Sequence, residues 1–215
     1  MARDKTPLIA KPGIPFILAG LIATVLAGFF SGWLAVTLGL ATCFVIWFFR
    51  DPERTIPTGA GLIVAPADGK IVQIQEEREE RFLKTQVIRI SIFLNVFDVH
   101  VNRMPCAGKI QKVVYHAGKF LSAHLDKASL ENEHQAILIE ASTGQQMVVV
   151  QIAGLIARRI VSWVRPGDRL DRGQRFGMIR FGSRVDTFLP IGTKLRVQRG
   201  DRVKGGETIL GEICE

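Results

Sequence analysis

The sequence predicts a mainly β protein of the α+β class: a compact antiparallel β barrel or sandwich with short helices, behind an N-terminal membrane helical hairpin. Three observations support this prediction: a long uncharged stretch near the N-terminus, a series of short apolar runs separated by Gly and Pro turns, and two turn sequences that each occur twice. The alternation of strands and helices that marks a parallel sheet is missing. We expect residues 1–55 to form the hairpin with its polar exit, and residues 56–215 to form one β-rich domain.

The uncharged stretch runs from Ile14 to Phe49, which is 36 residues without a charged side chain. A single helix of that length would measure about 54 Å, against a hydrocarbon core of roughly 30 Å. A Ser-Gly pair at residues 31–32 divides the stretch into two apolar segments. We therefore expect a helical hairpin that either crosses the membrane twice or dips into one leaflet. The stretch is too long for a cleaved signal peptide.

Basic residues flank both ends of the hairpin: Arg3, Lys5, Lys11, Arg50 and Arg54. Because Lys and Arg stay preferentially on the cytoplasmic side, they place both flanks and the following domain there. Three cysteines show no paired spacing that would indicate a disulfide framework or a zinc site, which agrees with a reducing compartment. The predicted location is the cell membrane, with the β-rich domain on the cytoplasmic side.

Positive charge is concentrated in the C-terminal third of the chain. The formal net charge is +8, and residues 155–204 alone contain 13 Lys and Arg against four Asp. Beside a membrane anchor, such an excess indicates an anionic lipid surface or a phosphate-bearing substrate as the partner. Nucleic acid is disfavoured, because no helix-turn-helix, zinc-finger or base-stacking pattern accompanies the charge.

Eight apolar runs with turn residues between them predict the strands of the domain. They are residues 62–65, 70–75, 87–94, 109–116, 136–141, 146–152, 175–180 and 185–189. The charged run 76–81 is predicted to be a solvated hairpin loop. Residues 120–130 show helical periodicity and are predicted to form a short helix.

Two turn sequences recur as weak repeats. Residues 66–71 (Pro-Ala-Asp-Gly-Lys-Ile) resemble residues 105–110 (Pro-Cys-Ala-Gly-Lys-Ile), and residues 167–173 (Gly-Asp-Arg-Leu-Asp-Arg-Gly) resemble residues 200–206 (Gly-Asp-Arg-Val-Lys-Gly-Gly). Each is typical of a turn that leads into a strand, so duplicated turns imply duplicated hairpins. The second sequence is similar to turns of barrel-sandwich hybrids of the lipoyl and biotinyl type, which supports the antiparallel prediction.

Gly182 and Ser183 form a Gly-Ser pair near the C-terminus, and Ser183 is the first of the last 33 residues. Such a pair usually forms a tight turn, in which Gly supplies an unusual φ and Ser bonds its own backbone. It can also be a site of self-cleavage, because Ser183 Oγ can attack the Gly182 carbonyl and convert the amide into an ester. The pair alone does not decide between the two interpretations.

Two further candidates for chemistry are Asp68 and His100. Asp68 lies in a turn, where Asp commonly caps backbone N–H groups. His100 follows an apolar run, where strand alternation would place Asp98, His100 and Asn102 on one face and line a pocket; the alternative is an exposed strand end. The other His residues lack metal-site spacing, so no metal is expected, and no nucleotide-binding loop or serine-hydrolase elbow occurs.

The chain resembles the phosphatidylserine decarboxylase proenzyme family, and most closely its short, archaeal-type branch. Four segments carry the resemblance, in this order: residues 65–69 (Ala-Pro-Ala-Asp-Gly), 97–105 (Phe-Asp-Val-His-Val-Asn-Arg-Met-Pro), 126–133 (Asp-Lys-Ala-Ser-Leu-Glu-Asn-Glu) and 181–186 (Phe-Gly-Ser-Arg-Val-Asp). Each segment is weak alone, but the four in this order are specific. The resemblance covers about residues 50–215.

The resemblance implies a proenzyme that cuts itself between Gly182 and Ser183. The products would be a β chain of residues 1–182 and an α chain of residues 183–215 that stay together. Ser183 would become a pyruvoyl group, the cofactor, which forms a Schiff base with the substrate. In the family an Asp and a His assist the serine, and Asp68 and His100 lie in the matching segments. Arg103 stands where many members have a second His, so His100 serves both maturation and turnover, or another group acts as the base.

The implied activity is the pyruvoyl-dependent decarboxylation of phosphatidylserine to phosphatidylethanolamine and CO2. The implied substrate-binding residues are Asn102, Arg103 and Arg184, and a homo-oligomer of αβ units is expected. One alternative is a membrane-anchored barrel-sandwich-hybrid adaptor without catalysis. Another is a pyruvoyl enzyme for a soluble amino acid, which the hairpin argues against.

Overall fold

The computed structural model describes residues 8–118, 132–154, 159–180 and 182–213. It divides into two compact units, residues 1–53 and residues 54–215. The helix expected at residues 120–130 lies outside the described residues.

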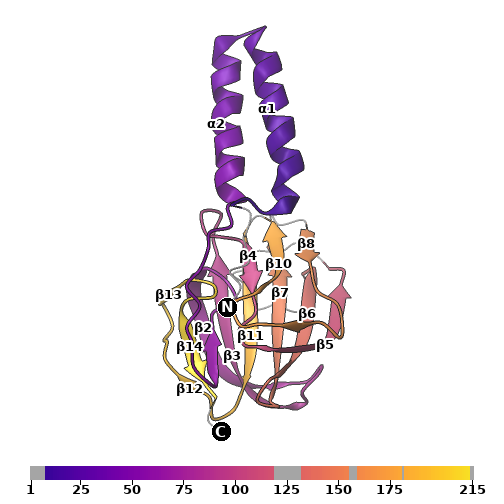
Figure 1. The fold of residues 1–215 in the computed structure, drawn as a ribbon, viewed down its shortest axis with the longest axis vertical. Coiled ribbons are helices and arrows are strands. Elements are labelled where there is room, and N and C mark those ends of the chain that lie inside the picture. The colour runs from indigo at the N-terminus through magenta and orange to yellow at the C-terminus, as the bar shows by residue number, and fades with distance from the viewer. Residues whose placement is uncertain (1–7, 119–131, 155–158, 181, 214–215) are drawn as a thin grey trace. The chain divides into compact units, whose positions relative to one another are not determined.

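The first unit is a hairpin of two helices, α1 (Ile14–Gly28) and α2 (Gly32–Phe48), with a 3-10 turn, η1 (Lys11–Gly13), before them (Figure 1). The two helices are joined by a three-residue connection. Ser31 caps α2, because its hydroxyl accepts a hydrogen bond from Leu34 N at 3.5 Å.

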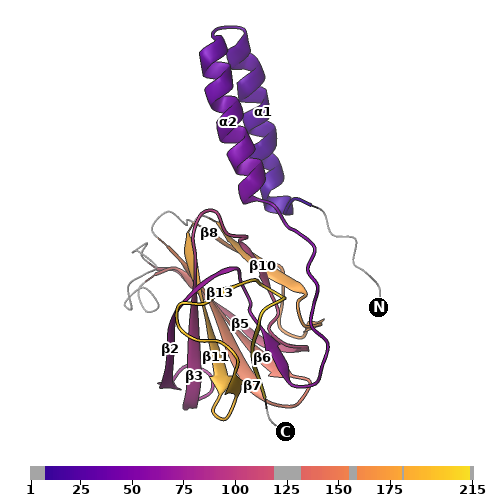
Figure 2. The same cartoon turned by 90° about the vertical axis from the view of Figure 1, so that its left-hand side faces the viewer.

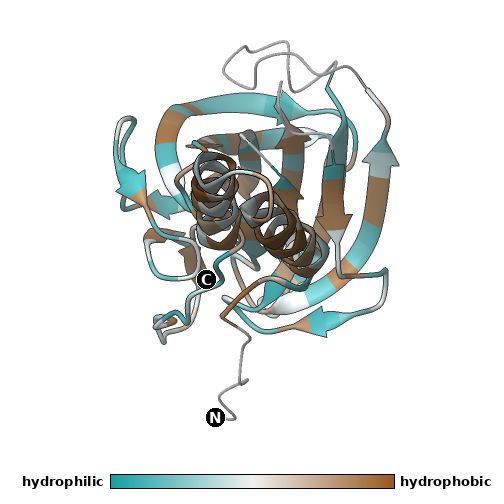
Figure 3. Cartoon of the chain, turned by 90° about the horizontal axis from the view of Figure 1, so that it is seen from above, coloured by the Kyte–Doolittle hydropathy of each residue, from teal (hydrophilic) through white to brown (hydrophobic). Residues whose placement is uncertain are grey.

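Both helices of the hairpin consist mostly of apolar residues, which are coloured brown in Figure 3. Phe30 and Trp33 at its tip are 86% and 85% exposed. The helical segment Lys11–Gly28 is long and apolar enough to cross a membrane, and Gly32–Phe48 is a shorter apolar helix. The helices pack closely at Gly20, whose Cβ, if it had one, would lie 2.6 Å from a hydroxyl of α2. Close packing through small residues is typical of helices in lipid.

The second unit consists of three antiparallel sheets (Figures 1 and 2). The largest has eight strands in this order: β13 (Arg202–Val203), β2 (Gly69–Glu79), β3 (Thr85–Leu94), β11 (Ser183–Pro190), β7 (Gln146–Ala153), β6 (His134–Ala141), β5 (Gly108–His116) and β9 (Arg169–Leu170). The second sheet has three: β4 (Val101–Arg103), β10 (Arg175–Arg180) and β8 (Arg159–Ser162). The third also has three: β1 (Leu62–Val64), β14 (Ile209–Glu212) and β12 (Lys194–Leu195).

The predicted antiparallel β class is confirmed, and so is each of the eight predicted strands. Among the described residues no sheet closes into a barrel, so the architecture is of packed open sheets. The sequence did not predict β4, β8, β9, β12, β13 and β14, which have only two to four residues each. Strands this short show no alternation that could reveal them.

The prediction of a loop at residues 76–81 is wrong, because β2 continues to Glu79. The Glu79 carboxylate is buried and accepts hydrogen bonds from the backbone of Arg81, Phe82 and Leu83 at 2.9, 2.8 and 2.6 Å. The turn therefore begins only after Glu79. A charged run can form a strand when the next strand supplies the register.

The duplicated turn sequences occupy equivalent places at the two edges of the large sheet. Ile71 N donates to Asp201 O at 2.9 Å in one copy, and Ile110 N donates to Asp168 O at 2.8 Å in the other. In both copies a second bond of 2.8 Å returns to the isoleucine carbonyl. Both β2 and β5 have an irregularity directly after this isoleucine. The duplication predicted from the sequence is therefore present in the backbone.

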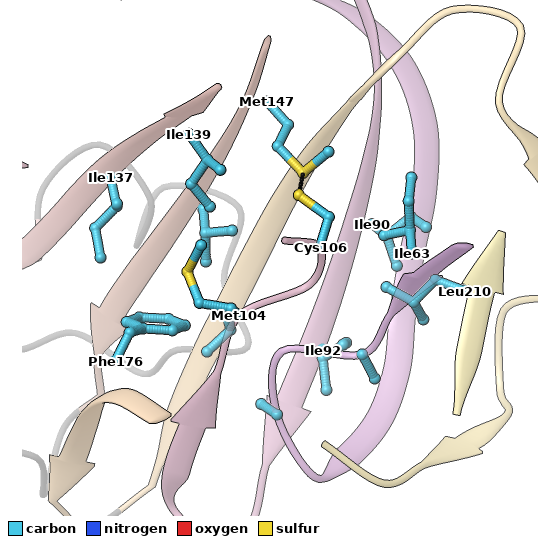
Figure 4. Packing of buried hydrophobic residues seen from close by; sticks show 14 of the residues in the cluster. Ile63, Ile90, Ile92, Met104, Cys106, Ile137, Ile139, Met147, Phe176 and Leu210 are labelled. Carbon is cyan, nitrogen blue, oxygen red and sulfur yellow. Dashed lines mark hydrogen bonds between the residues drawn. The ribbon is translucent and has the colours of Figure 1, made fainter. Parts of the chain in front are cut away.

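One cluster of buried apolar side chains joins all three sheets (Figure 4). It includes Ile92 from β3, Phe176 from β10 and Leu210 from β14. Within it, Cys106 Sγ lies 3.5 Å from Met147 Sδ. Burial raises the pKa of the Cys106 thiol to about 12. This thiol is therefore a packing group and not a nucleophile.

Candidate active site

Ser183 begins β11, in the middle of the large sheet. It pairs with Leu94 of β3 and Ala153 of β7. Both partners belong to the core cluster, so the Ser183 side chain faces the core side of the sheet. The side chain is fully buried, and its Oγ has no hydrogen-bond partner among the described residues. An unpaired buried hydroxyl costs free energy. Ser91 Oγ and Thr187 Oγ1 are also buried without a partner among the described residues, so what distinguishes Ser183 is its position directly after the Gly182 carbonyl.

The peptide bond before Ser183 has a special geometry. Gly182 has a φ of 61°, in the left-handed region. A Cβ there would meet no described atom within 4 Å, so there is room for a side chain. Glycine is favoured at this position by the backbone conformation alone. The Gly182 carbonyl oxygen accepts a hydrogen bond from Gly154 N at 3.1 Å. A donor at this oxygen stabilises the negative charge that forms when a nucleophile attacks the carbonyl carbon.

His100 is fully buried and directly precedes β4. Its Nδ1 lies 2.9 Å from Asp98 O. A ring nitrogen that faces a carbonyl oxygen carries the proton, which leaves Nε2 as the basic nitrogen of the neutral ring. His100 O accepts a hydrogen bond from Ile179 N at 3.3 Å. Since Ile179 lies in the strand that leads to Gly182, the structure brings His100 beside the segment that enters the Gly-Ser pair.

The expected alternation of Asp98, His100 and Asn102 along one strand is not observed. The strand begins only at Val101. Asp98 lies in the preceding turn, where its Oδ2 accepts a hydrogen bond from Asn95 N at 2.9 Å. The polar side chains of residues 95–98 therefore stabilise a turn. The prediction of a strand through Asp98 was wrong for this reason.

Asp68 contacts Arg54 and the backbone of Gly205. Arg54 Nη2 lies 3.0 and 2.8 Å from the two carboxylate oxygens, and Gly205 N donates to Oδ1 at 2.7 Å. Burial raises the pKa of the Asp68 carboxyl above its usual value, although Arg54 and the Gly205 N–H oppose the rise. The structure therefore joins Asp68 to the first residue of the second unit.

The two predicted substrate-binding arginines make contacts within the protein. Arg103 is buried, and its Nη1 donates to Gly173 O at 3.1 Å. Arg184 follows Ser183, so strand alternation turns its side chain to the opposite face of the sheet. There its Nε lies 2.9 Å from Asp186 Oδ1, and both side chains are almost fully buried. The structure thus separates Arg184 from the Ser183 hydroxyl.

Three buried amide side chains form a hydrogen-bonded chain of which the sequence analysis predicted only Asn102. Gln135 Nε2 donates to Gln151 Oε1 at 3.0 Å, and Gln151 Nε2 donates to Asn102 Oδ1 at 2.7 Å. Gln151 lies on the face of β7 that adjoins Ser183. Its signal in the sequence is its position as the one polar residue in the apolar run 147–153.

The segment 126–133 is described only at its last two residues, Asn132 and Glu133. Asn132 Nδ2 donates to Ala153 O at 2.8 Å, and Ala153 N donates to Glu133 O at 2.9 Å. Because Ala153 pairs with Ser183, these contacts support the strand beside the Gly-Ser pair. In the sequence, the segment 126–133 was noticed only as one of the four segments that resemble the family, and no role beside the Gly-Ser pair was predicted for it.

The arrangement contains groups that acyl transfer uses: a hydroxyl, an adjacent carbonyl with a hydrogen-bond donor, and a buried histidine whose backbone bonds to the strand before the Gly-Ser pair. Within the described ranges, no group of three His, Cys, Asp or Glu side chains could hold a metal ion.

Comparisons with known proteins identify the family of the chain. The sequence model described as phosphatidylserine decarboxylase matches residues 41–211. The chain is 54% identical to the phosphatidylserine decarboxylase proenzyme of Syntrophus aciditrophicus over 205 residues, 94% of this chain and 96% of that one. The proenzyme of the same name from Nitrosomonas europaea is 50% identical over 208 residues, 96% of each chain. That of Desulfotalea psychrophila is 47% identical over 214 residues, 99% of this chain and 100% of its own.

The Gly-Ser site and these matches define the chain as an enzyme, a carboxy-lyase. The chain belongs to the phosphatidylserine decarboxylase family. The resemblance carried by the four sequence segments is thereby confirmed.

Proposed function

We propose that this chain cuts itself between Gly182 and Ser183 and then decarboxylates phosphatidylserine to phosphatidylethanolamine, with release of CO2. One observation carries the proposal. The Ser183 hydroxyl is fully buried, has no partner among the described residues, and adjoins a carbonyl that accepts the Gly154 N–H. Membership of the family supports the substrate.

Self-cleavage begins with attack of Ser183 Oγ on the Gly182 carbonyl carbon. The hydroxyl proton is transferred to the departing Ser183 nitrogen, the amide bond breaks, and an ester forms. Loss of the Ser183 Cα proton then breaks the bond between Cβ and Oγ, which frees Gly182 as a carboxylate. The dehydroalanine left at position 183 takes up water and loses ammonia, which leaves a pyruvoyl group. The products are a β chain of residues 1–182 and an α chain of residues 183–215.

His100 is the proposed base. Its Nδ1 is held by Asp98 O at 2.9 Å, so the ring presents a basic Nε2. Asp68 is the proposed carboxylate of the family's serine relay, and here its oxygens receive Arg54 and the Gly205 N–H. Gly154 N stabilises the developing oxyanion on the Gly182 oxygen.

The residues around position 183 fit a pyruvoyl group made from the serine itself. The orphaned Ser183 Oγ is the atom that its formation removes, so the group needs no additional space. A pyruvoyl group would supply a ketone that takes up the substrate amine and delocalises the electron pair left on the α carbon when CO2 departs. The chain's own contribution is the burial of residue 183, which keeps water away, with His100 as the proposed proton donor to the product.

The α and β chains stay together in this proposal, because β11 lies between β3 and β7 in the large sheet. The apolar hairpin attaches the enzyme to the membrane that contains its lipid substrate. Basic residues on both flanks of the hairpin favour a cytoplasmic position for the second unit. The homo-oligomer of αβ units stays a prediction.

The test compares Ser183→Ala with Ser91→Ala, a matched control in the neighbouring strand. Ser91 is also fully buried, but it lies on the other face of the sheet, opposite Asp186. We expect the purified protein and Ser91→Ala to yield fragments 1–182 and 183–215 by intact mass, the smaller with a pyruvoyl end. Both should release CO2 from phosphatidylserine. We expect Ser183→Ala to stay whole and inactive. An intact, active Ser183→Ala protein contradicts the proposal.

A further inference from the structure

We propose that Asn102 donates a hydrogen bond to the carboxylate of the lipid's serine headgroup, and that Gln151 positions Asn102 for this contact. The inference rests on the proposed function and extends it to the substrate group that is lost as CO2. Asn102 is then a catalytic residue and Gln151 a positioning residue.

The direction of the amide chain decides which end of Asn102 is available. Gln135 donates to Gln151, and Gln151 donates to Asn102 Oδ1 at 2.7 Å. The Asn102 oxygen is therefore occupied, and the side chain presents its Nδ2 as a donor. Asn102 is fully buried, and its Nδ2 has no hydrogen-bond partner among the described residues. Such a donor is costly to bury unless an acceptor arrives.

The position of the chain places this donor near residue 183. In the β7–β11 pairing, Ala153 is opposite Ser183 and Gln151 is opposite Val185. Gln151 and Ser183 are diagonal neighbours on one face of the sheet, a relation that corresponds to about 7–8 Å. Asn102 comes from the other side, two residues after His100. Its side chain therefore connects the strand after the proposed base to the strand beside the cleavage site.

The chemistry of the reaction favours the carboxylate as the missing acceptor. The substrate amine binds at position 183, so the carboxylate lies one carbon away from that nitrogen. A cation would hold the carboxylate as an ion pair and oppose its loss, whereas a neutral amide orients it with less ground-state stabilisation. The nearby Arg184 guanidinium pairs with Asp186 on the opposite face of the sheet.

The experiment measures how much of each lipid is bound through its amine. The mass of the trapped adduct separates phosphatidylserine from the phosphatidylethanolamine that turnover makes from it. Vesicles that contain phosphatidylserine or phosphatidylethanolamine are added to the self-cleaved enzyme, and cyanoborohydride fixes the bound amine to position 183. The trapped fraction at each lipid concentration, measured by mass, gives an apparent affinity. Phosphatidylethanolamine has the same phosphate and amine but lacks the carboxylate. It therefore reports every contact except the proposed one.

We expect Asn102→Leu and Asn102→Ala to weaken phosphatidylserine trapping by about ten- to a hundredfold, the usual effect of a hydrogen bond to a charged group. Phosphatidylethanolamine trapping should be unchanged. Gln151→Glu should have the same selective effect, because its carboxyl group accepts from Asn102 Nδ2 and turns Oδ1 toward the substrate. Gln146→Leu, an exposed change in the same strand, should affect neither lipid.

An equal loss for both lipids, or no loss for either, overturns the inference while the proposed function stands. If the unaltered enzyme traps neither lipid, the proposed function fails and the inference fails with it. Where Gln151→Glu prevents self-cleavage, the Asn102 variants decide. Either Asn102 variant that yields the 183–215 fragment is sufficient.

Discussion

Arg54 and Asp68 are an ion pair in which neither side chain is well exposed, at 7% and 16%. Arg54 comes directly after the first unit, and Asp68 lies in the turn before β2. The pair therefore fixes the start of the second unit to its first long hairpin. Removing one partner of a buried pair leaves the other charge without compensation, which is usually more costly than losing both.

Arg54→Met should lower the free energy of unfolding by about 3 kcal/mol near neutral pH. Burial already raises the pKa of Asp68, and Arg54 opposes that rise, so the pKa should rise further in the variant. The folded variant then binds more protons than the unfolded chain between the usual and the raised pKa, so its stability increases as the pH falls. Urea unfolding at several pH values, with Ser183→Ala in both proteins to keep them uncut, measures the free energy of unfolding with and without Arg54→Met. The difference between the two free energies should become smaller as the pH falls.

The control is the double variant with Asp68→Asn, which removes both charges. We expect it to be more stable at neutral pH than Arg54→Met alone and to lose the pH dependence. A constant difference across the pH range would show that the Asp68 carboxyl does not titrate as described.

Sequence reasoning located Ser183, His100 and Asp68 because each lies in a short segment with a recognisable order of residue types. It did not find Gln151 or Gly154. Gln151 acts through a side-chain contact with Asn102, 49 residues away in the chain. The role we propose for Gly154 belongs to its backbone N–H, which every residue except proline has, so no residue type marks it.

At the scale of elements, the end of β7 adjoins the bond proposed to be cut. Gly154 N donates to Gly182 O at 3.1 Å, directly after the Ser183–Ala153 pair. The Gly154 N–H therefore has two roles in this proposal. It continues the backbone pairing beside β11, and it donates to the Gly182 oxygen that would become negatively charged.

Replacing Gly154 by glycolic acid, which exchanges its N–H for an ester oxygen, should slow self-cleavage by about a hundredfold. The rate is measured from the appearance of the 183–215 fragment by mass. Gly154→Ala keeps the N–H and serves as the control, with circular dichroism to establish the fold of both. A rate equal to that of the unaltered chain would remove Gly154 from the reaction.

The long strands were predictable because their apolar residues form runs bounded by turn residues. The two-residue strands β9, β12 and β13 exist only because a neighbouring strand supplies partners for them. In β13, Arg202 and Val203 pair with Lys70 and Gly69, more than a hundred residues earlier. Pairing over such a distance has no local signal.

At the scale of the whole molecule, the proposed cleavage before residue 183 would divide one buried core between two chains. The 183–215 piece contributes Val185, Leu189 and Leu210 to the cluster that joins the three sheets. Noncovalent contacts therefore have to hold the pieces together after the bond is broken.

The two fragments should co-elute in size-exclusion chromatography in detergent and separate only in guanidinium chloride. Leu210→Ala, which removes a fully buried side chain, should cost about 2–5 kcal/mol and lower the denaturant concentration at which they separate. Loss of the small fragment in native buffer would contradict this account.

The internal duplication has an unequal fate once the chain is cut. The copy made of β5 and β9 lies entirely before Gly182, whereas the copy made of β2 and β13 has one strand on each side of the break. The proposed mature enzyme would thus hold the same backbone arrangement twice, once within a single polypeptide and once between two. The Ile71–Asp201 hydrogen bond would then join two polypeptides, and the matching Ile110–Asp168 bond within one polypeptide is an internal reference for the effect of the break.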